Sequence, residues 1–197
     1  MKIILAPLPY ENWGGLHTMI FSLYFSLKKN GYHIIPIVPS NAVAIIKRFH
    51  NQKITVYKKN FSRIRKSWNF YSHLKFLVCM FRDIRELGRI IRLKKTSIVQ
   101  VSGLQNFHFA IAAKIYRCPL VWQIHSDALP PILRTLLTPL ARKLSDSIMV
   151  NGPHIEQKFK GLKSYPKKKI IHFFPGININ KYLFTHSQKK NAKKLLS

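Results

Sequence analysis

The sequence predicts an α/β domain: a doubly wound, mostly parallel, Rossmann-like sheet with helices on both faces. Short apolar runs of strand length alternate along the chain with longer segments of helical periodicity. Most of these apolar runs are continuous rather than alternating, which is typical of strands that are buried on both faces. The chain has 197 residues, 47% of them hydrophobic, so it can bury a sizeable core and is not a largely disordered protein.

The first half of the chain begins with a strand at residues 2–8, which prolines bound. A helix at residues 16–30 follows, because Leu16, Met19, Ile20, Leu23 and Leu27 recur on one helical face. Gly31 then stands where a left-handed helix cap is expected. The pattern continues with a strand at 33–38, a helix at 42–50, a strand at 54–57 and a long basic helix at 71–93.

The second half continues the alternation. It predicts strands at 97–101, 120–124, 147–150 and 170–174, and helices at 107–116, 131–144 and 153–159. Pro153 occupies the first position of its helix, where its missing N–H costs nothing. We expect residues 1–184 to form the domain and residues 185–197, which are rich in lysine, to be a basic linker or the start of a further domain.

The charge of the chain is strongly unbalanced. Lysine and arginine total 34 and aspartate and glutamate total 6, which gives a formal net charge of +28. Such a field attracts nucleic acid, anionic lipid or a phosphorylated substrate. Cys79 and Cys118 fit no metal or redox spacing, so we expect buried, inert thiols and a reducing compartment. No signal peptide or membrane span is expected either, which predicts a cytoplasmic protein.

A glycine pair, Gly14 and Gly15, separates the first strand from the first helix. It therefore lies at the carboxyl edge of the predicted sheet, where ligands of such sheets bind. Glycines let a ligand approach the backbone, and the helix start offers N–H groups to an anion. The spacing is neither that of the dinucleotide fingerprint nor that of a Walker loop. A tight turn without a ligand is the alternative explanation.

Five segments, in this order, resemble glycosyltransferase family 4. They are "GGLHTMIFSLYFSLKKNGYHIIPIVPS", "SIVQVSG", "CPLVWQIHSDALP", "LARKLSDSIMVNGPHIEQKF" and "KKKIIHFFPGININKYLF". The resemblance implies the GT-B fold, in which two Rossmann-like domains face each other. The amino-terminal domain mainly binds the acceptor, and the carboxyl-terminal domain binds the nucleotide sugar. This chain resembles the acceptor half alone.

The resemblance also implies the reaction. Family members transfer a sugar with retention of anomeric configuration, from a nucleotide sugar and with no bound metal or other cofactor. We therefore expect a chain that makes a polysaccharide or lipid-linked glycan, and that needs a donor-binding domain from a separate chain or a continuation. No Cys/His/Asp spacing typical of a metal site recurs in the sequence.

Residue by residue, the resemblance makes His125 the catalytic candidate, since it matches the histidine that points toward the transferred sugar. Gly14 and Gly15 match the loop near the donor phosphates and the acceptor. A histidine satisfied within its loop is the alternative for His125. Asp127 either binds a sugar hydroxyl or caps the next helix. Glu11 and Asn12 either line the acceptor site or are ordinary loop residues.

Other positions depart from the family pattern. His17 stands where the family often has an acid, Ser102 near a common histidine, and Asn151 in place of a serine. Pro175 and Asn178 stand where asparagine and aspartate flank the closing glycine. Ser102 and Asn151 remain candidate substrate contacts, but these departures put the acceptor contacts, and with them activity, in question.

Residues 58–95 combine many cations with interleaved aromatic residues and only two acids. This composition suits an anionic membrane surface, and in the family the corresponding helix often touches the inner leaflet. It equally suits a solvated helix face. Nucleic acid is disfavoured, because no helix-turn-helix, zinc-finger or RNP pattern is present. An inactive remnant and a basic binding module for nucleic acid or anionic surfaces are the alternatives to an enzyme.

Overall fold

The computed structural model describes residues 1–62, 70–126, 129–162, 166 and 169–174. The described strands are β1 (Lys2–Pro7), β2 (Tyr32–Val38), β3 (Tyr57–Lys58), β4 (Ile98–Ser102), β5 (Leu120–Ile124), β6 (Ser147–Val150) and β7 (Ile170–His172). The helices are α1 (Gly15–Lys29), α2 (Val43–His50), α3 (Phe70–Leu93), α4 (Phe107–Ile115), α5 (Pro131–Leu144) and α6 (Pro153–Lys158), with short 3₁₀ turns η1 (Leu104–Asn106) and η2 (Lys160–Leu162).

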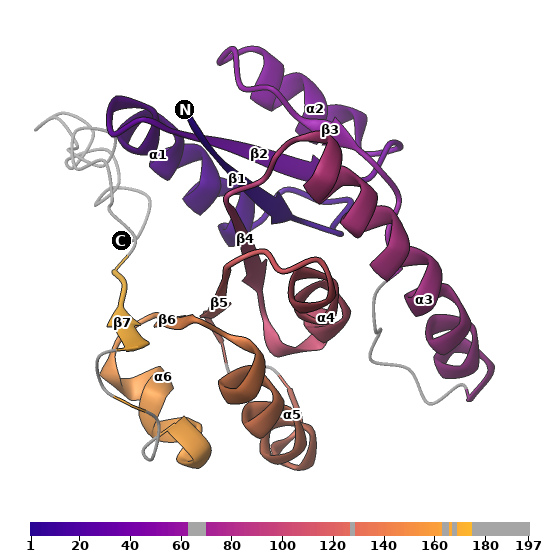
Figure 1. Ribbon diagram of the computed structural model, residues 1–197, viewed down its shortest axis with the longest axis vertical. Coiled ribbons are helices and arrows are strands. Elements are labelled where there is room, and N and C mark those ends of the chain that lie inside the picture. The colour runs from indigo at the N-terminus through magenta and orange to yellow at the C-terminus, as the bar shows by residue number, and fades with distance from the viewer. Residues whose placement is uncertain (63–69, 127–128, 163–165, 167–168, 175–197) are drawn as a thin grey trace, which may run out of the picture.

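The strands form one sheet in the order β3-β2-β1-β4-β5-β6-β7 (Figure 1). Every pair of neighbouring strands is parallel. This is the doubly wound Rossmann order, so the predicted fold class is confirmed. The order reverses between β1 and β4, and such a reversal is where these sheets bind ligands at their carboxyl edge.

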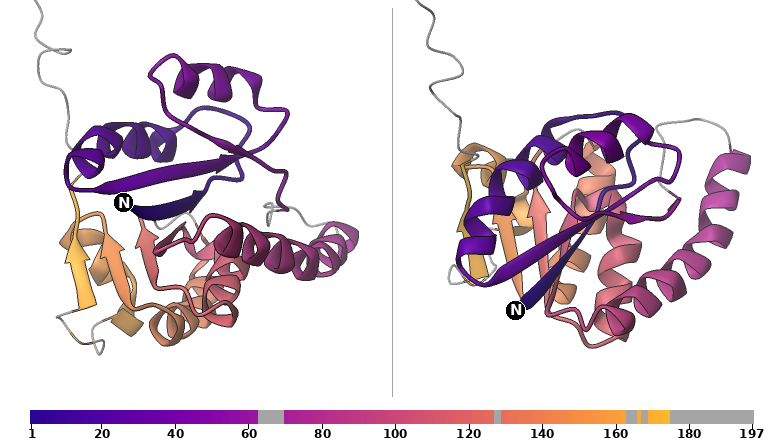
Figure 2. Two further views of the ribbon diagram at one scale, coloured as in Figure 1. Left: turned by 45° about the horizontal axis from the view of Figure 1, so that its top comes forward. Right: turned by 90° about the horizontal axis from the view of Figure 1, so that it is seen from above.

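Helices cover both faces of the sheet, as Figure 2 shows. The chain first moves outward from β1 to β3, and right-handed crossovers place α1 and α2 on one face. It then returns to β4 and moves the other way, which places the later helices on the opposite face. Two separate cores result: Ile20 and Phe49 belong to the first, Leu87, Phe109 and Trp122 to the second, and all five are buried.

The strand predicted at 54–57 is wrong for most of its length. Ile54 is buried, but it closes the turn after α2 rather than a strand. Its N–H donates to the carbonyl of Phe49 (3.1 Å), and Lys53 before it has a φ of 56°. In the sequence, the apolar Ile54 therefore looks like the first residue of a strand, although a turn is what buries it. Of the predicted strand, Tyr57 alone pairs with β2, together with Lys58 directly after it.

The other predicted elements are present, most with ends that differ by one or two residues. Gly31 has the left-handed conformation expected of a helix cap, with a φ of 80°. Cys118 is buried as predicted, but Cys79 is only half-buried on α3. The boundary predicted at 184/185 lies outside the described residues, as do Pro175 and Asn178. Among the described helices, none is both long enough and apolar enough to cross a membrane.

Candidate functional site

Four loops at the carboxyl edge of the sheet carry the sequence-predicted site residues. Glu11, Asn12, Gly14 and Gly15 follow β1, Ser102 ends β4, His125 follows β5 and Asn151 follows β6. Because all strands are parallel, these loops lie along one edge, on both sides of the point where the strand order reverses. Asp127, two residues after His125, lies outside the described residues.

Nothing in the fold requires glycine at Gly14 or Gly15. Gly14 is the N-cap of α1, in extended conformation with a φ of −148°, and both residues are exposed. A Cβ built on either glycine would meet no atom of the described residues within 4 Å. Gly31 differs, because its positive φ does favour glycine. The backbone conformation and the space around Gly14 and Gly15 therefore do not require glycine.

His17 fixes the start of α1. Its Nδ1 accepts a hydrogen bond from the Gly14 N–H (3.2 Å), so the neutral ring carries its proton on Nε2. The ring is buried, and burial lowers the pKa of His17 to about 4. Nε2 has no hydrogen-bond partner among the described residues. Where the family often has an acid, this chain thus has a neutral histidine that caps its own helix.

Trp13 anchors the loop in front of the glycine pair. Its indole stacks on His17, with ring centroids 5.5 Å apart, and the Arg48 guanidinium of α2 lies 4.1 Å from its ring centroid. Its Nε1–H donates to the Thr18 hydroxyl (2.9 Å). Trp13 is not among the predicted site residues, although a tryptophan directly before two glycines is a signal that the sequence does contain. The contact between Trp13 and Arg48 joins residues far apart in sequence, and nothing in the sequence pattern indicates it.

A second set of hydrogen bonds joins the β1 loop to the end of β4. Gln105 Nε2 donates to the Tyr10 hydroxyl (2.9 Å), and Asn106 Nδ2 donates to the Ser102 carbonyl (2.6 Å). Asn106 is fully buried. The two loops that flank the reversal of strand order are therefore fixed to each other rather than independent.

Gln123, fully buried on β5, connects the candidate residues of β4 and β6. Its Oε1 accepts from Gln100 Nε2 (3.1 Å) and from the Ser102 hydroxyl (3.4 Å). Its Nε2 donates to Asn151 Oδ1 (3.3 Å) and approaches Met19 Sδ (2.7 Å). Ser102 is itself buried, so in this structure its side chain faces the network and not solvent. Gln100 and Gln123 could have been recognised from the sequence, because each is a polar residue within an otherwise apolar strand.

His125 is half-buried at the end of β5, two residues beyond Gln123. Its Nδ1 is buried and has no partner among the described residues. Burial lowers the pKa of His125, so the ring is neutral at neutral pH. A neutral imidazole can donate a hydrogen bond from one ring nitrogen and accept one at the other, so it can bind a hydroxyl group wherever a ring nitrogen is accessible.

Few acids are left for a site. Four of the six carboxylates hold structural contacts: Asp83 with Ser62 and Arg82, Glu86 with Lys59 and Arg89, Asp146 with Lys114, and Glu156 with His172. The other two are Glu11, which is exposed in the β1 loop, and Asp127. Any carboxylate chemistry by this chain would therefore depend on these two residues.

The profile of Glycosyltransferase Family 4 matches residues 13–181, which include the glycine pair and every strand except β1. The chain belongs to glycosyltransferase family 4. A sequence comparison with curated proteins found no match.

Solved structures agree with this family assignment at the level of fold. HepE of Anabaena in complex with UDP has a TM-score of 0.71 and 14% identity over 100% of this chain and 50% of its own. A glycosyltransferase of Rickettsia africae has a TM-score of 0.69 and 17% identity. The match covers 98% of this chain and 49% of the Rickettsia protein. MnaA of Staphylococcus aureus, solved with UDP, has a TM-score of 0.62 and 16% identity. The match covers 95% of this chain and 48% of MnaA. This family 4 chain thus spans about half the length of these three structures, as one domain of a two-domain GT-B protein would.

Proposed function

We propose that the chain is the acceptor-side domain of a retaining glycosyltransferase. The reaction breaks the bond between the anomeric carbon and the nucleoside diphosphate, and joins that carbon to an acceptor hydroxyl whose proton is released. The acceptor is a growing polysaccharide or a lipid-linked glycan, and a donor-binding domain, on a separate chain or in a continuation, completes the enzyme. The proposal places the reaction in the cytoplasm, at the inner face of the cell membrane.

The glycine pair is the observation that carries this proposal. Glycine is dispensable for the turn and for packing at both positions, while α1 directs its first N–H groups toward the same edge of the sheet. An exposed backbone with no side chain gives a phosphate or sugar room to approach. In the proposed reaction the neutral, half-buried imidazole of His125 binds a sugar hydroxyl, and Gln123 holds Asn151 at the end of the neighbouring strand.

Nucleotide-sugar chemistry in related folds also supports the proposal. HepE was solved with UDP and with UDP and glucose, and MnaA was solved with UDP. These are properties of those proteins. We transfer to this chain only the class of donor, a nucleoside diphosphate sugar.

The test is a titration of the full chain with UDP-glucose, UDP-N-acetylglucosamine and GDP-mannose, followed by backbone amide NMR. Because the proposal gives the main donor contacts to another domain, we expect only weak binding, in which at least one donor shifts the amides of Gly14, Gly15 and the residues after β5 and β6; tight binding of a donor would contradict the acceptor-side assignment. Free glucose is the control, since it lacks the diphosphate. If no donor moves these amides, or if the shifts concentrate on the opposite edge of the sheet, the proposed site is wrong.

A further inference from the structure

A row of exposed cations follows the amino edge of the sheet, opposite the edge that carries the candidate site. The cations precede four strands that are neighbours in the sheet, β2, β1, β4 and β5. They are Lys28 and Lys29 before β2, Lys2 at the start of β1, Lys94 and Lys95 before β4, and Arg117 before β5, and all six are exposed. We call these six residues the amino-edge row.

Backbone hydrogen bonds between neighbouring strands fix the first part of the row. The Lys2 N–H donates to the Gly31 carbonyl (3.0 Å), which joins the start of β1 to the end of α1. The Ser97 N–H donates to the Ile3 carbonyl (2.8 Å), and Lys95 stands two residues before Ser97. The cations of β2, β1 and β4 therefore lie at the same height on the sheet.

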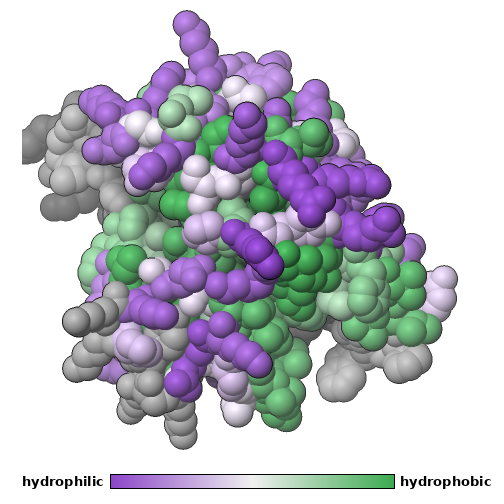
Figure 3. Space-filling model, viewed as in Figure 1, coloured by the Kyte–Doolittle hydropathy of each residue, from purple (hydrophilic) through white to green (hydrophobic). Residues whose placement is uncertain are grey.

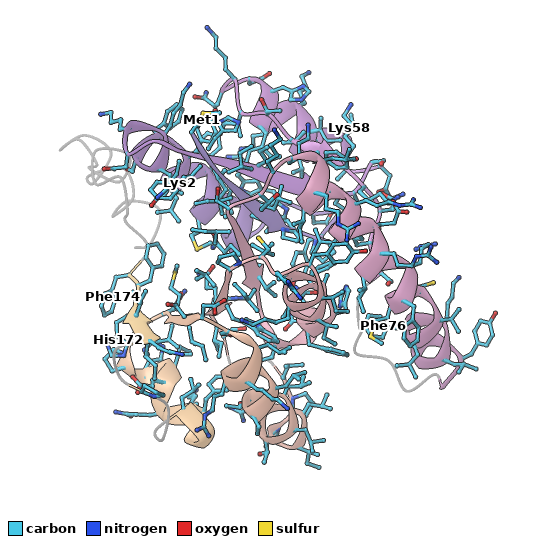
Figure 4. The ribbon with its side chains drawn as sticks, in the orientation of Figure 1. Met1, Lys2, Lys58, Phe76, His172 and Phe174 are labelled. Atoms are coloured by element: carbon cyan, nitrogen blue, oxygen red, sulfur yellow. The ribbon has the colours of Figure 1, made fainter. Side chains whose placement is uncertain are left out.

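The same kind of bond extends the row to β5. The Val99 N–H donates to the Pro119 carbonyl (2.8 Å), and Arg117 stands two residues before Pro119. Because neighbouring strands are about 4.8 Å apart, four of them make the row about 15 Å wide. Figure 4 shows Lys2 at the start of β1, across the molecule from Phe76 near the beginning of α3.

Two members of the row have a backbone conformation that favours glycine. Gly31 follows α1 with a φ of 80°, and in the corresponding turns after α3 and α4 Lys95 and Arg117 have φ of 47° and 51°. In all three turns the N–H of this residue donates to the carbonyl three residues before it (3.1 Å). The attraction of cations to the end of a helix explains a basic last turn, but it does not require this one position. At both positions the chain therefore has a cation where stability alone favours glycine.

Acids do not balance the row within the described part of the chain. None of its six cations forms a salt bridge there. Asp146, which precedes β6 at the same edge, is held by Lys114 (3.1 Å) and by the N–H of Leu120 (2.8 Å). Figure 3 shows hydrophilic side chains over α2 and the end of α3, away from the apolar surface at the start of α3. The row is therefore a surface of uncompensated positive charge.

The chemistry of the row fits a chain of anions. Ammonium and guanidinium groups are hydrogen-bond donors only, so they suit carboxylates and phosphates better than neutral hydroxyl groups. The tyrosines beside the row are not free to stack on a base, since each is half-buried with a cation of the chain 4.8–5.9 Å from its ring centroid: Tyr32, Tyr57 and Tyr116. Single-stranded nucleic acid depends on such stacking. The row thus offers charge to a polymer and little else.

We propose that the amino-edge row binds an acidic polysaccharide, as the part of the growing acceptor that has already been made. Carboxylates or phosphates along the polymer pair with successive cations of the row. β1 has six residues at about 3.3 Å each, so the row lies about 20 Å from the carboxyl edge. A polymer spans that distance and a single sugar does not, so the row keeps a long acidic acceptor attached between transfers. The inference rests on the proposed function and deepens it by naming an acidic polymer as the acceptor.

The test measures binding of fluorescently labelled oligogalacturonate, dextran phosphate and neutral dextran to the full chain by fluorescence anisotropy. K95G/R117G removes two charges from the row and gives both turns the residue that their conformation favours. K58Q/K75Q is the matched control, since it removes two exposed charges that lie outside the row. Thermal unfolding followed by circular dichroism gives the Tm of each variant.

We expect at least one of the two acidic polymers to bind the wild-type chain and K58Q/K75Q equally. K95G/R117G should bind it about fivefold more weakly, with an unchanged or higher Tm. Equal binding by the two variants would overturn the proposal, because the net charge alone would then account for binding. So would binding of neutral dextran, binding of neither acidic polymer, or an RNA oligomer of equal charge that binds the row more tightly than both.

This test and the donor titration fail independently. Donor shifts at the carboxyl edge without binding of an acidic polymer would leave the proposed function and overturn this inference. Polymer binding through the row without donor shifts would support a polysaccharide-binding surface and contradict the proposed transferase site.

Discussion

The guanidinium of Arg48 lies 4.1 Å from the ring centroid of Trp13, and this contact ties α2 to the loop that precedes the glycine pair. His17 stacks on Trp13 and binds the Gly14 N–H. Arg48, Trp13, His17 and Gly14 therefore form a chain of contacts from α2 to the start of α1. Through it, a residue distant in sequence helps to hold the loop in which the exposed glycines lie.

Arg48→Met tests this chain of contacts. The substitution keeps the aliphatic stem and removes the cation over the indole, which we expect to cost about 0.5–1 kcal/mol of unfolding free energy. The measurement is urea denaturation followed by tryptophan fluorescence. Arg85→Met is the control, because Arg85 is exposed on α3. Equal effects of the two substitutions would show that the Trp13 contact contributes nothing measurable.

Gly14→Ala and Gly15→Ala separate a folding role from a binding role. Since a Cβ at either position meets no atom within 4 Å in the described part of the chain, we expect unfolding free energies within about 0.5 kcal/mol of wild type. We expect weaker shifts with the donor that binds the wild-type chain. Gly31→Ala should do the opposite, losing about 1 kcal/mol or more because its φ is 80°, while binding is kept. Destabilisation by Gly14→Ala would assign the pair to the turn.

The sequence was sufficient for the fold because the information is local. Continuous apolar runs, the cap at Gly31 and the proline that opens α6 each act within a few residues, and they led to the correct order of elements. The error at 54–57 arose because Ile54 is buried from a turn, which periodicity cannot distinguish from a strand.

The candidate site was less predictable. Its loops were identified from their place after strands, but the side chains that hold them come from distant positions, such as Arg48 for Trp13 and Gln123 for Ser102 and Asn151. Such partners depend on the register of neighbouring strands and on helix packing. A single sequence specifies these only through the completed fold.

Gln123→Leu tests the network beneath the site. The leucine would leave Gln100, Ser102 and Asn151 without their shared partner, and buried polar groups that lose a partner cost about 1–3 kcal/mol. Chemical denaturation gives the loss, with Gln52→Leu as an exposed control that should stay within about 0.5 kcal/mol. An equally stable or more stable variant would mean that the network does not hold Asn151.

His108 predicts how stability depends on pH. The ring is fully buried between α3 and α4, and neither of its nitrogens has a hydrogen-bond partner among the described residues. Burial lowers the pKa of His108 to about 4, although the negative charge of Asp83 acts in the opposite direction. In the unfolded chain the pKa returns to about 6.5.

Below about pH 6.5 the unfolded chain therefore binds a proton that the folded chain excludes, so stability falls as the pH falls toward about 4. In this pH range His108 alone changes the free energy of unfolding by up to about 1.4 kcal/mol per pH unit. Above pH 6.5 the contribution is flat, because the ring is neutral in both states.

His108→Phe should remove this contribution. Phenylalanine suits a site lined by Phe76, Phe107 and Phe109, so we expect unchanged or higher stability at neutral pH and a shallower loss in acid. His17 and His125, whose pKa values burial also lowers, should keep part of the slope. Urea denaturation at a series of pH values measures it. A variant as acid-sensitive as wild type would mean that His108 is already protonated in the folded chain, paired with Asp83.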